Sequence, residues 1–238
     1  LLVKFIDARQ DLSIQVHPDD RLAWMRHKSN GKTEMWYVVA ADKGAHLKSG
    51  FSKQLTPAEY ERMVADHTLT DALCDYPVTA GDLFFLPAGR VHAICAGTFV
   101  AEIQQTSDIT YRIYDYGRTG ADGKPRELHT ELAKDAIDYT VLPDYRSHYA
   151  AAKNREVPLV SCPYFETSLY ELDAPLSRDL AALDSFLIVV CLKGSGVLCD
   201  DEGDEVPLRR GETLLVPAST RSVQFVPDPS LKLLTSHL

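Results

Sequence analysis

The residues best suited to chemistry in this 238-residue chain include two histidines and a glutamate that lie far apart in the sequence. His17 ends the segment 12–17 (LSIQVH), in which polar and apolar side chains alternate. Because strand side chains alternate between two faces, Ser13, Gln15 and His17 are expected on the same face. The commoner fate of such a pattern is a strand whose polar face lies in solvent.

A second strand-like segment, 32–36 (KTEMW), again directs polar groups, Lys32 and Glu34, to one face. His92 lies at the end of a third predicted strand. Two imidazoles, one carboxylate and one carboxamide that converge between strands can bind a divalent ion through nitrogen and oxygen. A lone histidine is more often structural, so the convergence of three strands favours the metal site.

Short strands must position these residues. Segments rich in β-branched and aromatic residues, separated by Gly, Asp and Pro, predict them. The strands expected in this part of the chain are 2–6, 12–16, 35–40, 83–86 and 93–103.

Two helices interrupt the strands. Thr56-Pro57-Ala58-Glu59 forms a capping box with proline at the first helical position, which predicts a helix through about residue 73. Apolar residues at helical spacing predict a second helix over about 127–138. Residues 140–158 contain two prolines and several charges and are predicted to be a linker. Strands are expected again from Tyr164 to the end of the chain.

An internal repeat indicates the architecture. Gly81 to His92 fits G-x5-P-x-G-x2-H, and Gly211 to Ser222 repeats this frame with serine at the second glycine and at the histidine. The pattern resembles the second signature of cupin β-barrels. The chain therefore resembles a mainly β protein with two jelly-roll-like cupin barrels, the second without ligands.

The expected domains follow from this repeat. The first barrel, with the metal and the active site, is predicted over residues 1–126, with a helical insertion at about 56–73. A helix and linker occupy 127–158, and the second barrel occupies 159–238. The second barrel is expected to be free of metal, because Ser185 and Ser222 lie near its ligand positions and bind divalent ions poorly.

Five separated segments carry a more specific resemblance. They are QVHPDD at 15–20, GKTEMWY at 31–37, GRVHAI at 89–94, EIQQ at 102–105 and YRIYDYGR at 111–118. In this order they resemble type I mannose-6-phosphate isomerase, most closely its short bacterial form. Members of that family carry several tens of residues before the position of Leu1, so the first barrel is expected to be incomplete at its N-terminus.

The resemblance also implies roles for individual residues. The four implied ligands of one zinc ion per chain are Gln15, His17, Glu34 and His92, with Gln15 the fourth. Arg112 falls on the catalytic arginine, and Glu102 on an active-site carboxylate. Ser13 and Lys32 fall on residues that approach the phosphate or hydroxyl groups of the substrate.

The implied reaction is the interconversion of mannose 6-phosphate and fructose 6-phosphate through an enediol. A divalent cation stabilises the charge that develops on oxygen, and Glu102 is the candidate for moving the proton between carbons. Arg112 stays charged, so its role would be electrostatic or positional. Two histidines and a carboxylate are also the ligands of iron(II) cupin dioxygenases, and a non-catalytic sugar-phosphate-binding bicupin is a third interpretation.

Composition limits the other partners. The chain has 25 Lys and Arg against 34 Asp and Glu, a net charge of −9, which argues against nucleic acids and anionic membranes as partners. No apolar run approaches the ~20 residues that cross a bilayer. Five cysteines without a CxxC spacing favour the cytoplasm. A small sugar phosphate is the expected partner.

Overall fold

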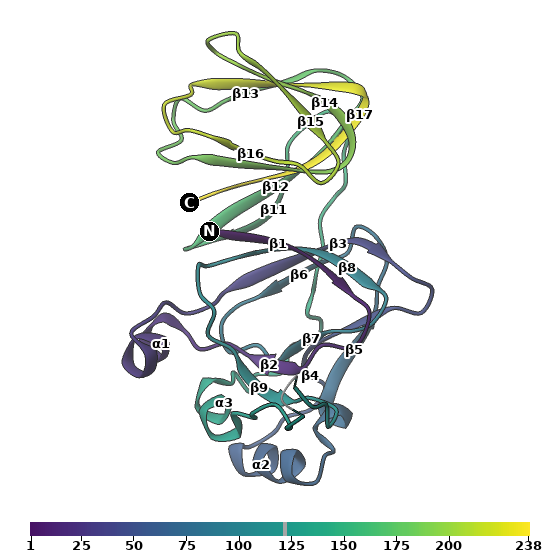
Figure 1. Cartoon of the computed structure of the whole chain (residues 1–238), viewed down its shortest axis with the longest axis vertical. Helices are drawn as coiled ribbons and strands as arrows, with labels where there is room; N and C mark the ends of the chain where they lie inside the picture. The colour runs from purple at the N-terminus through teal and green to yellow at the C-terminus, as the bar shows by residue number, and fades with distance from the viewer. Residues whose placement is uncertain (121–122) are drawn as a thin grey trace. The chain divides into compact units, whose positions relative to one another are not determined.

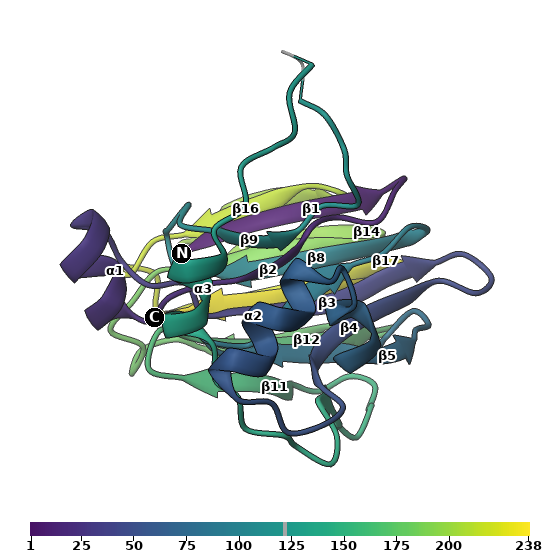
Figure 2. The same cartoon turned by 90° about the horizontal axis from the view of Figure 1, so that it is seen from below.

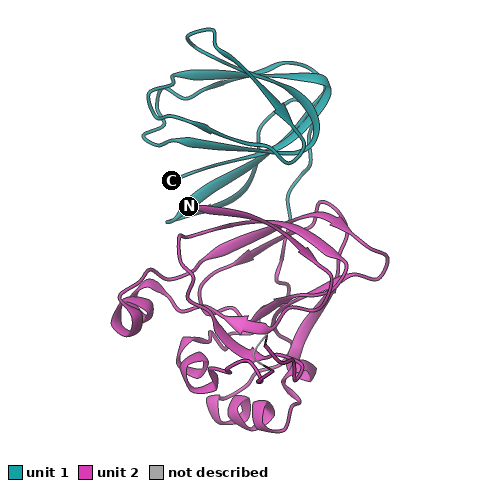
Figure 3. Ribbon diagram, viewed as in Figure 1, with its two compact units in different colours: residues 1, 148–238 teal, residues 2–147 magenta. Residues whose placement is uncertain are grey.

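The computed structural model describes residues 1–120 and 123–238, which form two compact units. The N-terminal unit is Leu2–Ser147, and the C-terminal unit is His148–Leu238 together with Leu1 (Figure 3). Strands dominate both units, which confirms the predicted mainly β fold (Figure 1). No helix among the described residues is both long enough and apolar enough to cross a membrane.

The N-terminal unit contains two five-stranded antiparallel sheets. The first, named here the β3 sheet, has in spatial order β1 (Leu2–Ala8), β8 (Thr98–Gln104), β3 (Glu34–Ala41), β6 (Leu83–Leu86) and β10 (Arg146–Ser147). The second, the β7 sheet, has β5 (Leu73–Pro77), β4 (His46–Phe51), β7 (His92–Ile94), β2 (Ile14–Val16) and β9 (Tyr111–Tyr114).

Both faces of the β7 sheet are covered. Its inner face meets the β3 sheet in a buried core that includes Trp36 and Phe84 from one sheet and Leu47 and Ile94 from the other. Its outer face packs against α2 (Pro57–Ala65) and α3 (Thr130–Ala136), which lie in front of it in Figure 2. Polar side chains between the two sheets are therefore shielded from water.

The helix α2 begins where its sequence predicts, whereas α3 begins at Thr130, three residues after its predicted start. The Thr56 hydroxyl accepts from the Glu59 backbone N–H at 3.2 Å and the Glu59 carboxylate accepts from the Thr56 N–H at 2.8 Å, the reciprocal bonds of a capping box. The helix ends earlier than predicted, at Ala65, and a 3-10 turn, η1 (Leu69–Ala72), follows a left-handed residue at His67. A further helix, α1 (Asp20–His27), was not predicted.

The strand predicted over 93–103 is two strands in different sheets. β7 ends at Ile94 and β8 begins at Thr98. Gly97 between them has φ +77°, and its N–H donates to the Ala8 carbonyl at 2.8 Å. The glycine permits this left-handed turn, through which the chain crosses from one sheet to the other.

The C-terminal unit is one seven-stranded antiparallel sheet. Its main path is β11 (Val157–Cys162), β12 (Phe165–Leu172), β17 (Ser222–His237), β14 (Leu187–Asp200) and β15 (Glu205–Arg209). β13 (Leu176–Asp179) pairs with β17, and β16 (Thr213–Val216) pairs with β14. The register between β14 and β17 shifts twice, near Cys191 and Gly194, and these bulges bend the long strands around an apolar core.

The segment 127–158 is not a separate helix and linker in the structure. The helix α3 packs on the outer core of the N-terminal unit through Ala133, and β10 joins the β3 sheet through Arg146 and Ser147. The boundary between the compact units lies at 147/148, within the segment predicted as helix and linker. The side chains of Ala133 and Tyr145 are buried, and this burial keeps the segment with the N-terminal unit.

Candidate metal centre

Three of the predicted ligands converge between the two sheets of the N-terminal unit. His17 directly follows β2, Glu34 begins β3 and His92 begins β7. Their exposed fractions are 2%, 0% and 1%, and one ligand atom from each lies within 4.8 Å of the others. His92 Nε2 is 3.3 Å from Glu34 Oε1, and His17 Nε2 is 3.6 Å from Glu34 Oε2.

Backbone carbonyls orient both imidazoles. His17 Nδ1 lies 2.9 Å from the Ile109 carbonyl oxygen, and His92 Nδ1 lies 2.8 Å from the Arg90 carbonyl oxygen. Because a carbonyl only accepts, each Nδ1 donates its proton and each Nε2 directs a lone pair toward the cluster. Histidine ligands in metal sites are held in this way.

The glutamate has an unsatisfied oxygen. Glu34 Oε1 is buried and has no hydrogen-bond partner in the described structure. Leaving a buried acceptor unpaired costs about 1–3 kcal/mol, so the arrangement is favourable only when something binds there. Two imidazole nitrogens and a carboxylate oxygen fit a divalent transition metal, zinc among them.

The predicted fourth ligand, Gln15, lies beside the cluster. It pairs with His92 across β2 and β7, which places both side chains on the inner face of the β7 sheet. Its amide nitrogen is 3.3 Å from His92 Nε2. A half-turn of the amide group brings its oxygen to this position, where it can act as a ligand atom.

Lys32 occupies the same cluster. Its side chain is nearly fully buried, and its ammonium donates to Glu34 Oε2 and lies 3.1 Å from His17 Nε2. It also lies 3.9 Å from Glu102 Oε1. The sequence interpretation assigned this lysine to the substrate, with neutralisation of Glu34 as the alternative. In the structure its ammonium lies against two of the predicted ligands.

Burial governs the charges of the three ligands. Desolvation, with the Lys32 charge, lowers the pKa of His92 to about 3 and lowers the pKa of His17 well below its ordinary value. Both rings are therefore neutral near pH 7, the form that binds metals. Desolvation, with the nearby Glu102 charge, raises the pKa of Glu34 to about 7 despite the opposing effect of Lys32. The carboxylate therefore lacks sufficient positive charge beside it.

Two hydrogen-bond donors hold the buried Glu102 carboxylate. Oε1 accepts from Lys4 Nζ at 3.0 Å, and Oε2 accepts from the Trp36 indole N–H at 2.9 Å. Burial by itself would raise the pKa of Glu102, but the charges of Lys32 and Lys4 outweigh it and lower the pKa. Glu102 is therefore charged at neutral pH.

Sequence reasoning missed Lys4, Trp36 and Gln104 as members of this network. Lys4 and Trp36 are the cross-strand partners of Glu102 on β1 and β3, and Lys4 also donates to the Gln104 side chain. Period two does place Glu102 and Gln104 on one face of a strand, as it places Glu34 and Trp36 on one face. The available signal was Lys4, the one charged residue of the predicted strand 2–6.

Arg112 and Ser13 lie outside the cluster. Arg112 pairs with Gln15 across β9 and β2, so the two residues share a face of the β7 sheet. Its guanidinium donates to the Glu127 carbonyl oxygen at 3.0 Å, and its Nε is buried without a partner among the described residues. Ser13 is buried just before β2. Among the described residues, neither the Arg112 nor the Ser13 side chain forms a hydrogen bond or ion pair with the three candidate ligands.

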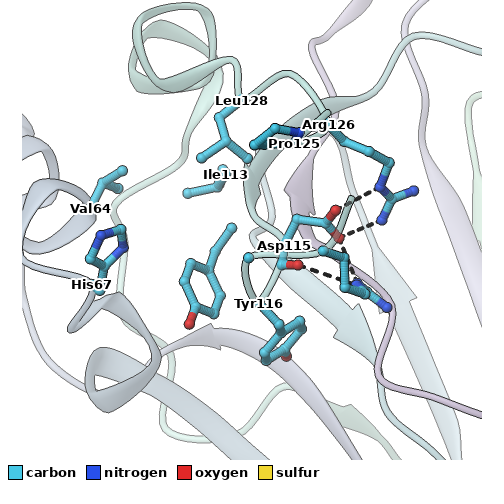
Figure 4. Close-up of a pocket in the computed structure, with 11 residues that line it drawn as sticks. Val64, His67, Ile113, Asp115, Tyr116, Pro125, Arg126 and Leu128 are labelled. Atoms are coloured by element: carbon cyan, nitrogen blue, oxygen red, sulfur yellow. Dashed lines mark hydrogen bonds and ion pairs between the residues drawn. The ribbon is translucent and has the colours of Figure 1, made fainter. Parts of the chain in front are cut away.

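A separate cavity of about 430 Å³ lies near the end of β9. None of the predicted site residues lines it; its walls include His67, Ile113 and Tyr116 (Figure 4). At its edge the buried Asp115 carboxylate accepts from Arg118 and Arg126. Because Arg126 precedes Glu127, this ion cluster holds the backbone that contacts the guanidinium of the catalytic-arginine candidate.

The C-terminal unit has no comparable cluster among the residues that the structure describes, where His17, Glu34 and His92 form the one group of at least three potential metal ligands. Ser222 begins β17. The Ser185 hydroxyl accepts from the Leu238 backbone N–H at 3.2 Å.

Comparison with known proteins supplies an independent result. A family model described as the cupin domain of mannose-6-phosphate isomerase matches residues 155–238. The mannose-6-phosphate isomerase of Streptococcus mutans is 34% identical over 238 residues, which are 100% of this chain and 73% of that protein. The isomerase ManA of Bacillus subtilis is 35% identical over 220 residues, 91% of this chain and 69% of that protein.

A solved structure agrees with the sequence comparisons. The crystal structure of the mannose 6-phosphate isomerase from Bacillus subtilis superposes with a TM-score of 0.90 at 30% identity. The match covers 100% of this chain and 74% of that chain. Both cupin-like units therefore have counterparts in a known structure.

Proposed function

The chain belongs to the mannose-6-phosphate isomerase family, and we propose on that premise that it interconverts mannose 6-phosphate and fructose 6-phosphate with one zinc ion. His17, Glu34 and His92 would hold the ion, and Gln15 would be the fourth ligand. The observation that carries the proposal is that two imidazole nitrogens that carry lone pairs lie close to a buried carboxylate with an unsatisfied oxygen.

Zinc at this position would supply Lewis acidity, which stabilises negative charge on the substrate oxygens as an enediol forms. The protein contributes neutral imidazoles and a site enclosed between two sheets. Exclusion of water strengthens every charge interaction within such a site.

Glu102 is the proposed proton carrier between C1 and C2. It is charged at neutral pH, as a general base must be, and its two oxygens are oriented by Lys4 and Trp36. Its lowered pKa means that an accepted proton is readily released, which suits a reaction that returns the proton to the neighbouring carbon.

Arg112 and the substrate residues have electrostatic roles in this proposal. The Arg112 guanidinium would stabilise charge on the reacting oxygens, and its buried, unpartnered Nε is a donor available for this. Ser13 and Lys32 would contact the hydroxyl or phosphate groups of the sugar phosphate.

The five free cysteines are consistent with a reaction in the cytoplasm.

The decisive experiment is a coupled assay from mannose 6-phosphate to fructose 6-phosphate, before and after removal of metal by a chelator. We expect activity to be lost with the metal and restored by one equivalent of zinc per chain. Iron(II) added in place of zinc, with oxygen uptake recorded, separates this activity from that of a dioxygenase. Sugar-phosphate binding without turnover in the zinc-loaded protein would contradict the proposal.

Turnover in heavy water tests the proton carrier. A proton held on Glu102 exchanges with solvent during the lifetime of the enediol, so deuterium is expected at C1 or C2 of the product. Glu102→Gln should abolish both turnover and incorporation, because the amide cannot accept the proton. Absence of deuterium together with an active Glu102→Gln variant would remove Glu102 from this role.

A further inference from the structure

The ammonium of Lys32 lies on two of the three candidate ligands. It donates to Glu34 Oε2 and lies 3.1 Å from His17 Nε2. Because the Ile109 carbonyl accepts the Nδ1 proton of His17, the hydrogen bond at Nε2 runs from lysine to histidine. Lys32 therefore uses the lone pair with which His17 would bind a metal.

We infer that Lys32 takes the place of the metal in the metal-free protein and must release His17 and Glu34 when the ion binds, transferring its ammonium to Glu102. This inference rests on the metal site of the proposed function. It concerns a step that precedes the reaction: the exchange of one buried cation for another.

Competition at His17 is the first reason. An imidazole Nε2 has a single lone pair in the plane of the ring, and it cannot both accept from an ammonium and coordinate an ion. The Glu34 carboxylate has more acceptor positions, but sharing them would keep two positive charges close together in a buried site. Binding of the ion therefore expels the ammonium.

A second anion is available nearby. Lys32 Nζ is 3.9 Å from Glu102 Oε1, and the Glu102 carboxylate is itself buried. Rotation about the long lysine side chain can move the ammonium to Glu102 without exposing it or leaving it unpaired. Lys4 already donates to that oxygen, and a carboxylate oxygen accepts more than one hydrogen bond.

This exchange has two consequences. Without metal, the Lys32 ammonium pairs with Glu34 and His17, so these candidate ligands are already held together before the ion arrives. With metal, the ammonium lies at Glu102, the proposed proton carrier, and becomes available to the substrate. Occupation of the metal site thereby sets the position of a substrate-binding group.

Lys32→Met tests the inference, with Lys4→Met as the matched control. Both variants remove a lysine that interacts with Glu102, but only Lys32 contacts the candidate ligand atoms. The readouts are the zinc dissociation constant, measured by competition with a chelating dye, and the thermal midpoint of the metal-free and zinc-loaded proteins.

We expect Lys32→Met to bind zinc at least about tenfold more tightly than the wild type, because no ammonium must be displaced. Its metal-free form should have a lower thermal midpoint, and zinc should remove this difference. Lys4→Met should change zinc affinity by less than about threefold. Lys32→Gln, which is neutral but keeps a donor, gives the same comparison if the Met variant does not fold.

The outcomes distinguish this inference from the proposed function. A wild type that binds no zinc defeats the metal site itself. A wild type that binds zinc, with affinity unchanged or weakened in Lys32→Met, overturns the exchange and leaves the metal site intact. Equal tightening in Lys32→Met and Lys4→Met also overturns it, because the effect would then come from net charge rather than from displacement.

Discussion

The two units share the repeated glycine and proline motif and the strand pairing around it. They differ in the side chains that their strands bury. In the N-terminal unit, Glu34 pairs across β3 and β6 with Leu86, the fifth residue after the first glycine of the repeated motif. In the C-terminal unit, Leu187 pairs across β14 and β16 with Val216, which has the same place in its copy of the motif. Leu187 therefore occupies the position of Glu34.

Two other groups are exchanged in the same way. His92 is the eleventh residue after the glycine of its motif, and Ser222 has that place in the C-terminal unit. Glu102 pairs with the residue two positions after Glu34, and Thr235 pairs with the corresponding residue of β14. Two of the candidate ligands, Glu34 and His92, and the proposed proton carrier are thus replaced at the matched positions of the C-terminal unit.

The difference shows that the repeated motif does not depend on the candidate metal and catalytic residues. Both frames begin at a glycine with positive φ, Gly81 at 101° and Gly211 at 88°, so the turn depends on the backbone and not on the inner face. Complete burial of an apolar side chain such as Leu187 contributes about 1.5–3 kcal/mol. Burial of Glu34 has the opposite sign unless a cation accompanies it.

The largest effect is expected when the N-terminal unit receives a residue of the C-terminal unit. His92→Ser removes one of three candidate ligands, so zinc affinity should fall by more than about 100-fold, beyond what changes around a site cost. Turnover should be lost with the metal. Metal analysis and the coupled assay measure both, with His46→Ser in the same sheet as the control that retains zinc.

Arg112→Ala tests whether the inner face of the β7 sheet supplies a catalytic group besides the candidate metal ligands. If the guanidinium stabilises charge in the transition state, kcat should fall by about 10²–10³ while zinc content and fold are unchanged. Steady-state kinetics and metal analysis decide this. A normal kcat with a raised KM would transfer Arg112 to substrate binding.

Leu187→Ala tests the contribution of the C-terminal unit to stability. Truncation of this buried leucine should lower the free energy of unfolding of that unit by about 2–5 kcal/mol and leave zinc affinity unchanged. The exposed Leu215 of β16 is the matched control, for which Leu215→Ala should change stability by less than about 0.5 kcal/mol. Loss of zinc in Leu187→Ala would show that the units are not separable in function.

Asp115 provides a smaller, pH-dependent test in the N-terminal unit. Burial would raise the pKa of Asp115, but hydrogen bonds from Arg126 and Arg118 outweigh it and lower the pKa. The stabilisation is therefore present above about pH 4, the ordinary pKa of aspartate, and is lost as the pH falls through the lowered value.

Asp115→Asn should accordingly lower the thermal midpoint by roughly 3–10 °C at pH 7, and the difference from wild type should shrink toward pH 3. Thermal unfolding across this pH range measures it. The exposed Asp7→Asn is the control without an effect. A difference that is independent of pH would mean that the charge of Asp115 does not stabilise the fold.

The smallest effect is expected from the reverse exchange. Ser222→His restores one imidazole to the C-terminal unit, but Leu187 still stands where the carboxylate would be needed. Zinc stoichiometry should remain at one per chain. A second tight site in this variant, detected by metal titration, would show that the frame itself and not the full ligand set determines binding.

Some features of this protein follow from local sequence. Period two in the segment 12–17 places Gln15 and His17 together on the inner face, and the capping box places the start of α2 at Pro57. The repeated glycine and proline motif predicted two similar units, and the fold confirms it. These patterns are readable because each depends on residues close in sequence and on the fixed geometry of a strand, a helix end or a turn.

Other features were decided only by the tertiary structure. The donors to Glu102 come from Lys4 and Trp36, which lie 98 and 66 residues away in the sequence, and Lys32 reaches His17 across 15 residues. Periodicity gives the face of a strand but neither the neighbouring strand nor its register. The contacts that give the buried Glu102 carboxylate its charge are set by the order and register of strands in the β3 sheet. The contact of Lys32 with His17 is set by the packing of the two sheets.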